Sequence, residues 1–505
     1  MSESKSDIQA TTKEQTSNYR SVFKATSLFG GVQVYQILIG IIRSKVIAVL
    51  LGPAGMGIQG LYQSTLDLIK SVTALGLEQS AVRDISEANG SKNEHLIART
   101  VAVTRRLIWL TGMAGLLLTL VLSPWLSTLT FGNRDYTWGF VILSSTLLFN
   151  QICSGQKVLL QGLRRLKDLA KTTAIGSTIG LLVSIPLYYW IGVKGIVPTM
   201  VLTSVAMLLL SWHYSRKVKI EEVKVTTREA ISEGRSMMKM GIAMSVSGIL
   251  VALSAYVLRW FIRQQGGVEE VGLFTAGFII VSTYIGMIFS AMSTDYYPRL
   301  AAVNKDNSRC REIINQQAEV AILISSPIIV FGMVFMPFII RLIYSESFLP
   351  ANHYILIALL GMMFKVVSWS VSFVFLAKAE SRLFMINETV TNLYGLAFNL
   401  LGYWLGGLAG LGISYAAMYF IYMIQVYIIA RKRYGFGFSL SFKRVYGILF
   451  LMVIACFALI MAWQSAWVYL PSIVILAGCS FYSFYELNKR VQVMQYVKQR
   501  FKRDV

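Results

Sequence analysis

Residues 28–58 read LFGGVQVYQILIGIIRSKVIAVLLGPAGMGI, an apolar run that carries charges and ends in a glycine-rich turn. The run is long enough to cross about 30 Å of hydrocarbon as a helix. Arg43 lies nine residues before Gly52, which places it about 13 Å deep at 1.5 Å per residue. At that depth its side chain cannot easily reach the membrane surface. We therefore predict a membrane helix whose Arg43 faces a water-filled cavity.

Similar apolar runs recur along the whole chain. Its 505 residues are 55% hydrophobic and only 14% charged, with a mean hydropathy of +0.58, whereas a soluble protein of this size carries more charge. The runs long enough to span a membrane lie near residues 28–51, 58–81, 107–127, 138–161, 170–191, 195–214, 238–262, 272–297, 317–340, 354–376, 384–404, 410–430, 446–463 and 467–486. They predict an all-α polytopic membrane protein with about 14 transmembrane helices.

The basic residues are unevenly distributed between the loops. The chain has 47 Lys and Arg against 25 Asp and Glu, and nearly all of the loop cations fall on one side of the predicted membrane. The loops of the opposite side hold only Arg134, Lys194, Arg263 and Arg341. The positive-inside rule then places both termini in the cytoplasm. The net positive charge is therefore explained by membrane topology and by contact of the basic loops with anionic lipid headgroups of the bilayer. It does not indicate binding to nucleic acid.

A basic loop over residues 215–237 separates the first twelve spans into two sets of six. Six spans per half make a parallel repeat, with a pseudo-two-fold axis along the membrane normal. The predicted parts are a disordered cytoplasmic tail (1–20), an N-terminal six-helix bundle (21–214), a basic cytoplasmic linker (215–237), a C-terminal six-helix bundle (238–433), two extra transmembrane helices (434–488) and a basic cytoplasmic tail (489–505).

The first spans of the two halves lead into similar turns. Arg43 precedes Gly57 by 14 residues, and Arg259 precedes Gly272 by 13. We expect two pseudo-symmetric six-helix bundles around a central cavity, with two peripheral helices outside them.

Six cations lie inside the predicted spans. Unmatched, they would cost on the order of 15–20 kcal/mol at roughly 2.5–3.5 kcal/mol each. The carboxylates at comparable depth are Asp67, Glu78 and Asp295, and the last two are near span ends. A cationic, water-filled cavity for an anionic substrate explains this excess. The six cations are Arg43, Lys45, Lys70, Lys157, Arg259 and Lys365.

Each cation also has a simpler explanation. Lys70 lies three residues from Asp67 on one helix face, so a local ion pair is an equal alternative. Lys157 and Arg259 lie near span ends and could extend to the surface, while Lys45 points away from Arg43. For Arg43 and Lys365, both deep in their spans, a role in the cavity is favoured.

Polar residues continue these faces at helical spacing. Gln36 lies seven residues before Arg43, Gln63 lies seven before Lys70, and Asn150 lies seven before Lys157. With the six cations, these three amides complete the predicted substrate-binding set. Asp67, deep in the second span, is the candidate for coupling to an ion.

Sequence motifs for catalysis are lacking. The sequence has no G-x-x-x-x-G-K-[ST] loop for ATP and no H-E-x-x-H metal motif, and its three histidines are isolated. The outer loops are too short for the chemistry of a polymerase or glycosyltransferase. We therefore predict a transporter, not an enzyme, with no cofactor or metal.

The N-terminal part of the chain resembles O-antigen translocases. The resemblance rests on Lys24–Gly31, on Ile41–Lys45, on the turn Gly52–Ile58 and on Ser80–Ser86. These proteins, the Wzx-type flippases, form the polysaccharide transporter branch of the multidrug/oligosaccharidyl-lipid/polysaccharide exporter superfamily. The specific motifs cover about residues 24–90, and the rest agrees in span number, repeat and charge placement.

The resemblance implies a function in the bacterial inner membrane. Undecaprenyl-diphosphate-linked oligosaccharide, an O-antigen-type repeat unit, would pass from the cytoplasmic to the periplasmic leaflet by alternating access. It implies O-antigen polymerase and chain-length machinery as partners, and coupling to H⁺ or Na⁺ and the membrane potential. A cation-coupled multidrug exporter of the same superfamily and, more weakly, a lipid-sugar polymerase remain alternatives. Multidrug exporters usually place an acidic residue in the binding lobe, whereas the deep charges here are mainly cationic.

Overall fold

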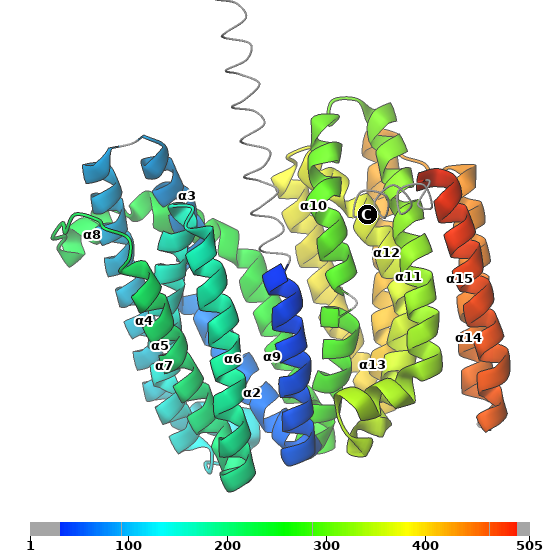
Figure 1. The fold of residues 1–505 in the computed structure, drawn as a ribbon, viewed down its shortest axis with the longest axis horizontal. Helices are drawn as coiled ribbons and strands as arrows, with labels where there is room; N and C mark the ends of the chain where they lie inside the picture. The colour runs from blue at the N-terminus through cyan, green and yellow to red at the C-terminus, as the bar shows by residue number, and fades with distance from the viewer. Residues whose placement is uncertain (1–30, 92, 285, 464, 492–505) are drawn as a thin grey trace, which may run out of the picture. The chain divides into compact units, whose positions relative to one another are not determined.

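The computed structural model describes residues 31–491 except 92, 285 and 464. Within these residues every regular element is a helix (Figure 1). The predicted tail 1–20, most of the tail 489–505 and the segment Lys24–Gly30 of the resemblance lie outside the described residues. Contacts divide the chain into two compact units. The described residues up to 51 and residues 61–256 form the first unit, and residues 52–60 join 257–491 in the second.

The first unit is a helical bundle built mainly on packing among α4, α5, α6 and α7 (Figure 1). Its helices are Gly31–Leu50, α2 (Gly52–Thr73, of which residues from 61 onward belong here), α3 (Leu77–Gly90), α4 (Glu94–Phe131), α5 (Thr137–Gly162), α6 (Leu166–Ile191), η1 (Gly192–Gly195), α7 (Ile196–Ser215), α8 (Thr227–Glu233) and the start of α9 (Arg235–Phe278). Asn93 begins α4, since its Oδ1 accepts the backbone N–H of Leu96 at 3.1 Å. Gly112 faces Leu148 and Gln151 of α5, and this small residue lets α4 and α5 approach closely.

The second unit is centred on α11, α12 and α13, which pack on one another. Its elements are the rest of α9, the π-helical η2 (Ile279–Tyr284), α10 (Gly286–Ala302), α11 (Asn307–Ile343), η3 (Glu346–Ala351), α12 (Asn352–Ala377), α13 (Ser381–Tyr434), α14 (Leu440–Ala462), η4 (Ala466–Val468) and α15 (Tyr469–Val491). The helix α12 is the inner one, because α11, α13 and α14 all pack against it.

The span count agrees with the sequence. By length and hydropathy alone, nine stretches of the described chain can cross a membrane. Three of them contain a break: one joins α6 to α7, one bends at Gly267 and one bends at Gly406–Gly407. Dividing these three gives twelve spans, and α2 and α5, which carry more polar residues, complete the predicted fourteen. The prediction of an all-α polytopic membrane protein is confirmed.

Two turns of the second unit have matching sequence patterns and backbone conformations. Gly52 and Gly267 both adopt left-handed backbone conformations, with φ of 65° and 83°, which glycine adopts without strain. These two residues are 215 positions apart, as are Gly57 and Gly272, the last glycines of the predicted repeat. The matching turns therefore share a backbone conformation as well as a sequence pattern.

The same turns also pack against each other symmetrically. A Cβ added to Gly57 would lie 2.0 Å from the carbonyl oxygen of Val268, and one added to Gly272 would lie 1.9 Å from that of Pro53. Val268 is again 215 positions from Pro53, so each contact is the pseudo-two-fold image of the other. Only glycine fits at either position, which explains why each turn ends in one.

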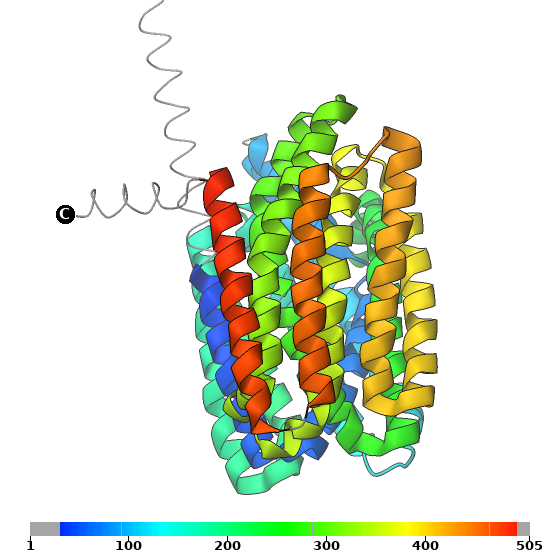
Figure 2. The ribbon, with the colours of Figure 1, turned by 90° about the vertical axis from the view of Figure 1, so that its right-hand side faces the viewer.

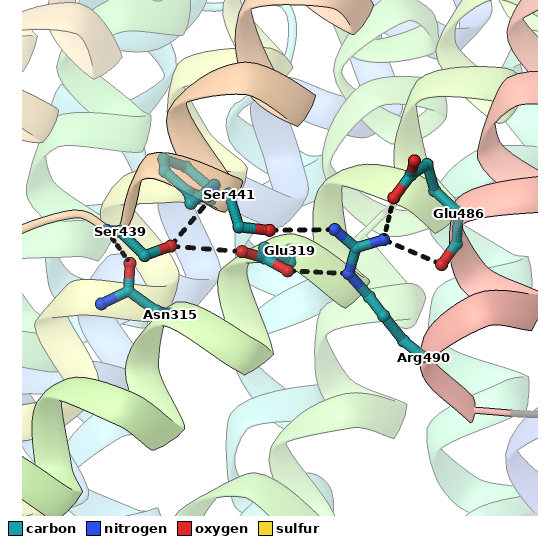
Figure 3. Close-up of polar contacts among 7 residues, drawn as sticks. Asn315, Glu319, Ser439, Ser441, Glu486 and Arg490 are labelled. Carbon is teal, nitrogen blue, oxygen red and sulfur yellow. Dashed lines mark hydrogen bonds and ion pairs between the residues drawn. The ribbon is translucent and has the colours of Figure 1, made fainter.

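The helices α14 and α15 lie on α11 at the side of the second unit (Figure 2). Their outward faces are apolar, as Leu451, Val474 and Phe481 show with exposed fractions of 67%, 65% and 74%. Near the start of α14 and the end of α15, Arg490 contacts the buried Glu319 of α11 (Figure 3). These are the two peripheral helices that the sequence predicts.

The predicted linker 215–237 is partly folded against the first unit. The helix α8 begins in a capping box, in which Thr226 and Glu229 exchange hydrogen bonds. Glu233 then accepts a hydrogen bond from Nε of Arg99 of α4 at 2.9 Å. The contact division falls later, at residue 256 inside α9, so this segment belongs to the first unit.

Candidate functional site

A cavity of about 180 Å³ lies inside the first unit. We call it the arginine pocket. Its walls come from the helix Gly31–Leu50 and from α2, α5 and α7. It is lined by Arg43, Gln63, Leu66, Asp67, Lys70, Thr146, Leu147, Asn150, Met200, Thr203, Ser204 and Met207. Two cations and one carboxylate thus meet in a polar cavity between apolar helices.

Arg43 reaches this cavity from the middle of its helix. Its guanidinium also lies beside the Tyr188 hydroxyl of α6. The Nε of Arg43 and the Oγ1 of Thr203 are buried, and neither has a hydrogen-bond partner among the described residues. Because a buried polar atom without a partner is costly, both atoms are suited to binding a polar ligand in the pocket.

The helix α2 contributes one polar face to the pocket. Gln63, Asp67 and Lys70 follow at spacings of four and three residues, so they share a side of the helix. Nε2 of Gln63 donates a hydrogen bond to Oδ1 of Asp67 at 2.9 Å. This bond holds the amide against the carboxylate, so the polar residues that share this face of α2 also contact one another.

Lys70 forms an ion pair with Glu78 of α3, with Nζ 2.9 Å from Oε1. Residues eight apart on a straight helix would be separated by about 12 Å along its axis. The helix is broken between them, where Leu75 and Gly76 have φ values of 50° and 62°. A Cβ on Gly76 would lie 2.1 Å from the carbonyl oxygen of Gly241 in α9. The break therefore requires glycine at 76, and it turns Glu78 back toward Lys70.

A second cavity of the first unit has a volume of about 430 Å³, and Glu78 is one of the residues that line it. We call it the lysine pocket. It is lined by Glu78, Gln79, Val82, Ser154, Lys157, Val158, Gln161 and Leu169. Lys157 follows Asn150 by seven residues along α5, a rise of about 10 Å. The lysine pocket is therefore nearer than the arginine pocket to the α5 end that charge distribution predicts to be cytoplasmic.

The second unit places its two cations beside aromatic rings. The guanidinium carbon of Arg259 lies 5.5 Å from the ring centre of Phe274 and 5.8 Å from that of Phe278. Nζ of Lys365 donates a hydrogen bond to the Tyr415 hydroxyl at 3.3 Å and lies 4.9 Å from the ring centre of Tyr419. Both arrangements are cation–π contacts.

The structure brings together part of the predicted set. Gln36 and Lys45 are half-buried on the helix of Arg43, but neither lines the two pockets described here. Asp295 pairs with Arg299 one turn along α10 at 3.1 Å. The predicted residues that line the arginine pocket are Arg43, Gln63, Asp67, Lys70 and Asn150, while Lys157 lines the lysine pocket.

Sequence reasoning missed the wall that α7 supplies. Its span reads as apolar, yet Thr203 and Ser204 line the arginine pocket. Thr199, Thr203 and Met207 recur at intervals of four, a helical spacing that could have identified this face. The Glu78 partner of Lys70 was also missed, because spacing on an unbroken helix favours Asp67.

Comparison with known proteins identifies the family. The model of the family described as "Polysaccharide biosynthesis protein" matches residues 46–353, more than half of the chain. The protein belongs to this family. The match begins just after Arg43 and runs to the start of α12, so it covers most of both pockets and Arg259.

Curated relatives of the chain are named as membrane transporters. The Lipid III flippase of Escherichia coli (strain K12) is 21% identical over 428 residues, which cover 82% of this chain and all of that protein. A Shigella flexneri protein whose name describes O-antigen transport is 23% identical over 330 residues, covering 63% of this chain and 76% of that one. These names describe transport and not catalysis.

Solved structures share the fold. A multidrug resistance MATE family transporter of the MOP superfamily, in an inward-facing conformation, has a TM-score of 0.69 and 17% identity, covering 81% of this chain and 96% of that one. The lipid II flippase MurJ, in an inward closed conformation, has a TM-score of 0.69 and 11% identity, covering 92% and 98%. At these identities the likeness extends to the fold, and the multi-pass helical architecture is common to all three proteins.

Proposed function

We propose that this protein is a flippase that moves an undecaprenyl-diphosphate-linked oligosaccharide, of the O-antigen type, from the cytoplasmic to the periplasmic leaflet. Alternating access of a central cavity would carry the headgroup across, with both termini in the cytoplasm of a bacterium. The observation that carries the proposal is the arginine pocket, a cationic cavity inside a member of a polysaccharide biosynthesis family. The names of the curated relatives support it.

The chemistry of the pocket suits a diphosphate. Arg43 offers a planar fork that can bind two phosphate oxygens at once, and Lys70 offers a compact point charge. Gln63 and Asn150 can hydrogen-bond to the first sugar. A cavity of about 180 Å³ is smaller than the roughly 300–1,000 Å³ of sites that enclose a whole small molecule. The pocket therefore fits the diphosphate and its nearest groups, and the lipid tail stays in the bilayer.

The second unit contributes different contacts in this proposal. Lys365 and Arg259 provide charge for the diphosphate, while the ring of the half-buried Tyr419 beside Lys365 offers a flat apolar face for a sugar ring. Lys45, Lys157 and Gln36 complete the proposed substrate-binding set. Lys157 stands apart from Arg43, because it lines the separate lysine pocket.

The membrane potential supplies part of the driving force. Two negative charges moving outward gain up to about 4.6 kcal/mol per 100 mV, at about 2.3 kcal/mol for each charge. A proton or sodium ion bound in the same cycle would change this gain. Asp67 is the proposed site of that coupling, since its carboxylate lines the pocket with Arg43 and Lys70.

The alternative of a cation-coupled multidrug exporter shares the fold of the MATE neighbour. Fold alone does not separate the two functions. The charges of the arginine pocket favour the flippase, because two cations beside one carboxylate repel a cationic drug. A lipid-sugar polymerase receives no support from the names of the relatives.

The test is complementation of a flippase-null strain. We expect Arg43→Ala and Lys365→Ala to abolish export while the protein still inserts and accumulates, and Arg43→Lys to retain part of it. Arg382→Ala is the control, because this arginine is exposed in the first turn of α13. Export near the wild-type level in both alanine variants would overturn the assignment of the cations to the diphosphate.

A further inference from the structure

The ion pair of Lys70 with Glu78 connects the two cavities of the first unit. Lys70 lines the arginine pocket and Glu78 lines the lysine pocket. Their charged atoms are 2.9 Å apart, and both side chains remain about a third exposed, at 35% and 38%. A ligand that moved from one cavity to the other along α5 would meet this pair.

The arginine pocket by itself is cationic, and Glu78, which faces Lys70 from the lysine pocket, supplies the second carboxylate that balances it. Lys70 and Arg43 are matched by Asp67 and Glu78, all of them lining one of the two pockets. An arriving anion therefore gains full contact with Lys70 only when it displaces a carboxylate. Lys157, in the lysine pocket, is the cation that remains outside this balance.

We propose that Glu78 is an exchangeable counter-ion that gates the passage of a diphosphate from the lysine pocket to the arginine pocket. This inference rests on the proposed function and adds the order of events. The diphosphate first binds Lys157 while Glu78 holds Lys70. The partners then exchange, so that the diphosphate binds Lys70 and Glu78 turns to Lys157. At each stage, every cation and carboxylate has a partner of opposite charge.

Two features of the structure favour exchange over a permanent link. The Lys70 and Glu78 side chains are each about a third exposed, although the Oε1 atom of Glu78 is itself buried, and an ion pair with such exposure contributes little net stability. A diphosphate also carries more charge than a carboxylate. Glu78 is also bordered by Ser154 and Lys157 on the wall of the same cavity, so its carboxylate has a second cation within its own pocket.

The backbone around Glu78 supports a local movement. The carboxylate follows the break at Leu75 and Gly76, and it lies in the first turn of α3. A rotation of its side chain needs no change in α2, which carries Lys70 and Asp67. The close approach of Gly76 to Gly241 fixes the break itself, so the exchange is confined to side chains.

The test measures binding of farnesyl diphosphate to the purified full-length protein by calorimetric titration. Glu78→Gln removes the competing anion and keeps the shape, so we expect three- to tenfold tighter binding together with slower export. Glu87→Gln, an exposed acid on the same helix, is the matched control and should change neither. In the background of Lys70→Gln, the effect of Glu78→Gln on affinity should disappear, because the two residues then have no shared step.

The possible outcomes distinguish failure of the proposed Glu78 gate from failure of the proposed flippase function. If Glu78→Gln binds farnesyl diphosphate as the wild type does or more weakly, while Arg43→Gln weakens binding at least tenfold, the gate is overturned and the diphosphate site stands. If Arg43→Gln and Lys70→Gln both bind normally, the proposed function itself fails. Glu78→Asp guards against a folding defect: it keeps the charge and should bind as the wild type, and tighter binding in this variant would also contradict the gate.

Discussion

Two deep cations of the first unit, Arg43 and Lys70, lie near carboxylates, whereas Arg259 and Lys365 of the second unit lie on aromatic rings. Lys70 pairs with Glu78 at 2.9 Å, and Arg43 shares its pocket with Asp67. In the second unit Lys365 lies over Tyr419 and Arg259 lies over Phe274. The two halves therefore stabilise deep positive charge by different means.

The difference matters when an anion arrives. A carboxylate partner competes with the anion for the same cation, so binding and release can be exchanged step by step. A ring does not compete, because it occupies one side of the cation and carries no net charge. We infer that Lys70 of the first unit is suited to capturing and passing on a diphosphate, and that Lys365 of the second unit presents constant positive charge.

The largest expected effect separates charge from packing at Lys365. Lys365→Met keeps a long apolar side chain beside Tyr415 and Tyr419 but removes the charge, and we expect export to fall about tenfold, the equivalent of about 1.4 kcal/mol. Lys365→Arg should retain most of the activity, since a guanidinium stacks well on rings. Complementation at matched protein level measures both.

If Lys365→Met exports as well as the wild type, the lysine is a packing residue and the comparison of the two halves loses its functional meaning. Tyr419→Leu is the companion variant. It removes the ring and keeps the charge, so it should reduce export less than Lys365→Met does.

The fold can be predicted well from the sequence, because a membrane helix is recognised from the length and hydropathy of its apolar run. Even α2 and α5 were identified, although both carry the polar residues that line the pockets. The paired turns were also found, because glycine is required at Gly57 and Gly272 by close contact with a carbonyl. Such constraints act on single residues and remain visible in a single chain.

The site was predicted only in part, and the reason is geometric. Helical spacing groups residues of one helix, so it brought Gln63, Asp67 and Lys70 together correctly. It cannot give the partner across a break, and the left-handed turn at Gly76 is what brings Glu78 to Lys70. Helical spacing can show that Thr199, Thr203 and Met207 share a face of α7, but which cavity that face lines depends on packing between helices.

A smaller effect is expected where an ion pair is buried and structural. In the second unit Glu319 is only 8% exposed, and Oε2 accepts a hydrogen bond from Nε of Arg490 at 2.8 Å (Figure 3). Glu319→Gln should lower the free energy of unfolding by only about 1 kcal/mol, because Arg490 keeps Glu486 as a partner. Thermal unfolding followed by tryptophan fluorescence measures the change, which should appear as a melting temperature lower by about one to two degrees.

The contrast with the first unit is the control for this prediction. Glu78→Gln breaks a partly exposed pair and should change the melting temperature less than Glu319→Gln does. The opposite order would mean that the pair of Lys70 holds the first unit together, and its role as an exchangeable contact would then be untenable.

The smallest effect concerns an exposed pair of the first unit, outside the spans. Hydrogen bonding from Arg99 lowers the pKa of the Glu233 carboxyl below its usual value near 4.5, and the backbone N–H of Thr226 lowers the pKa of Glu229 likewise. A lowered pKa in the folded state means that the stabilisation is present above pH 4.5 and is lost as the pH falls through the folded-state value. Hydrogen exchange over residues 226–234, corrected for intrinsic rates, should therefore show constant protection of α8 from pH 5 to 8 and a decline below about pH 4.

Glu233→Gln should weaken protection at neutral pH and flatten this dependence, while Glu221→Gln, an exposed acid of the same segment, should leave it unchanged. Protection that stayed constant down to pH 3 would show that apolar contacts, such as that of the buried Ala230, hold α8 in place without help from either carboxylate.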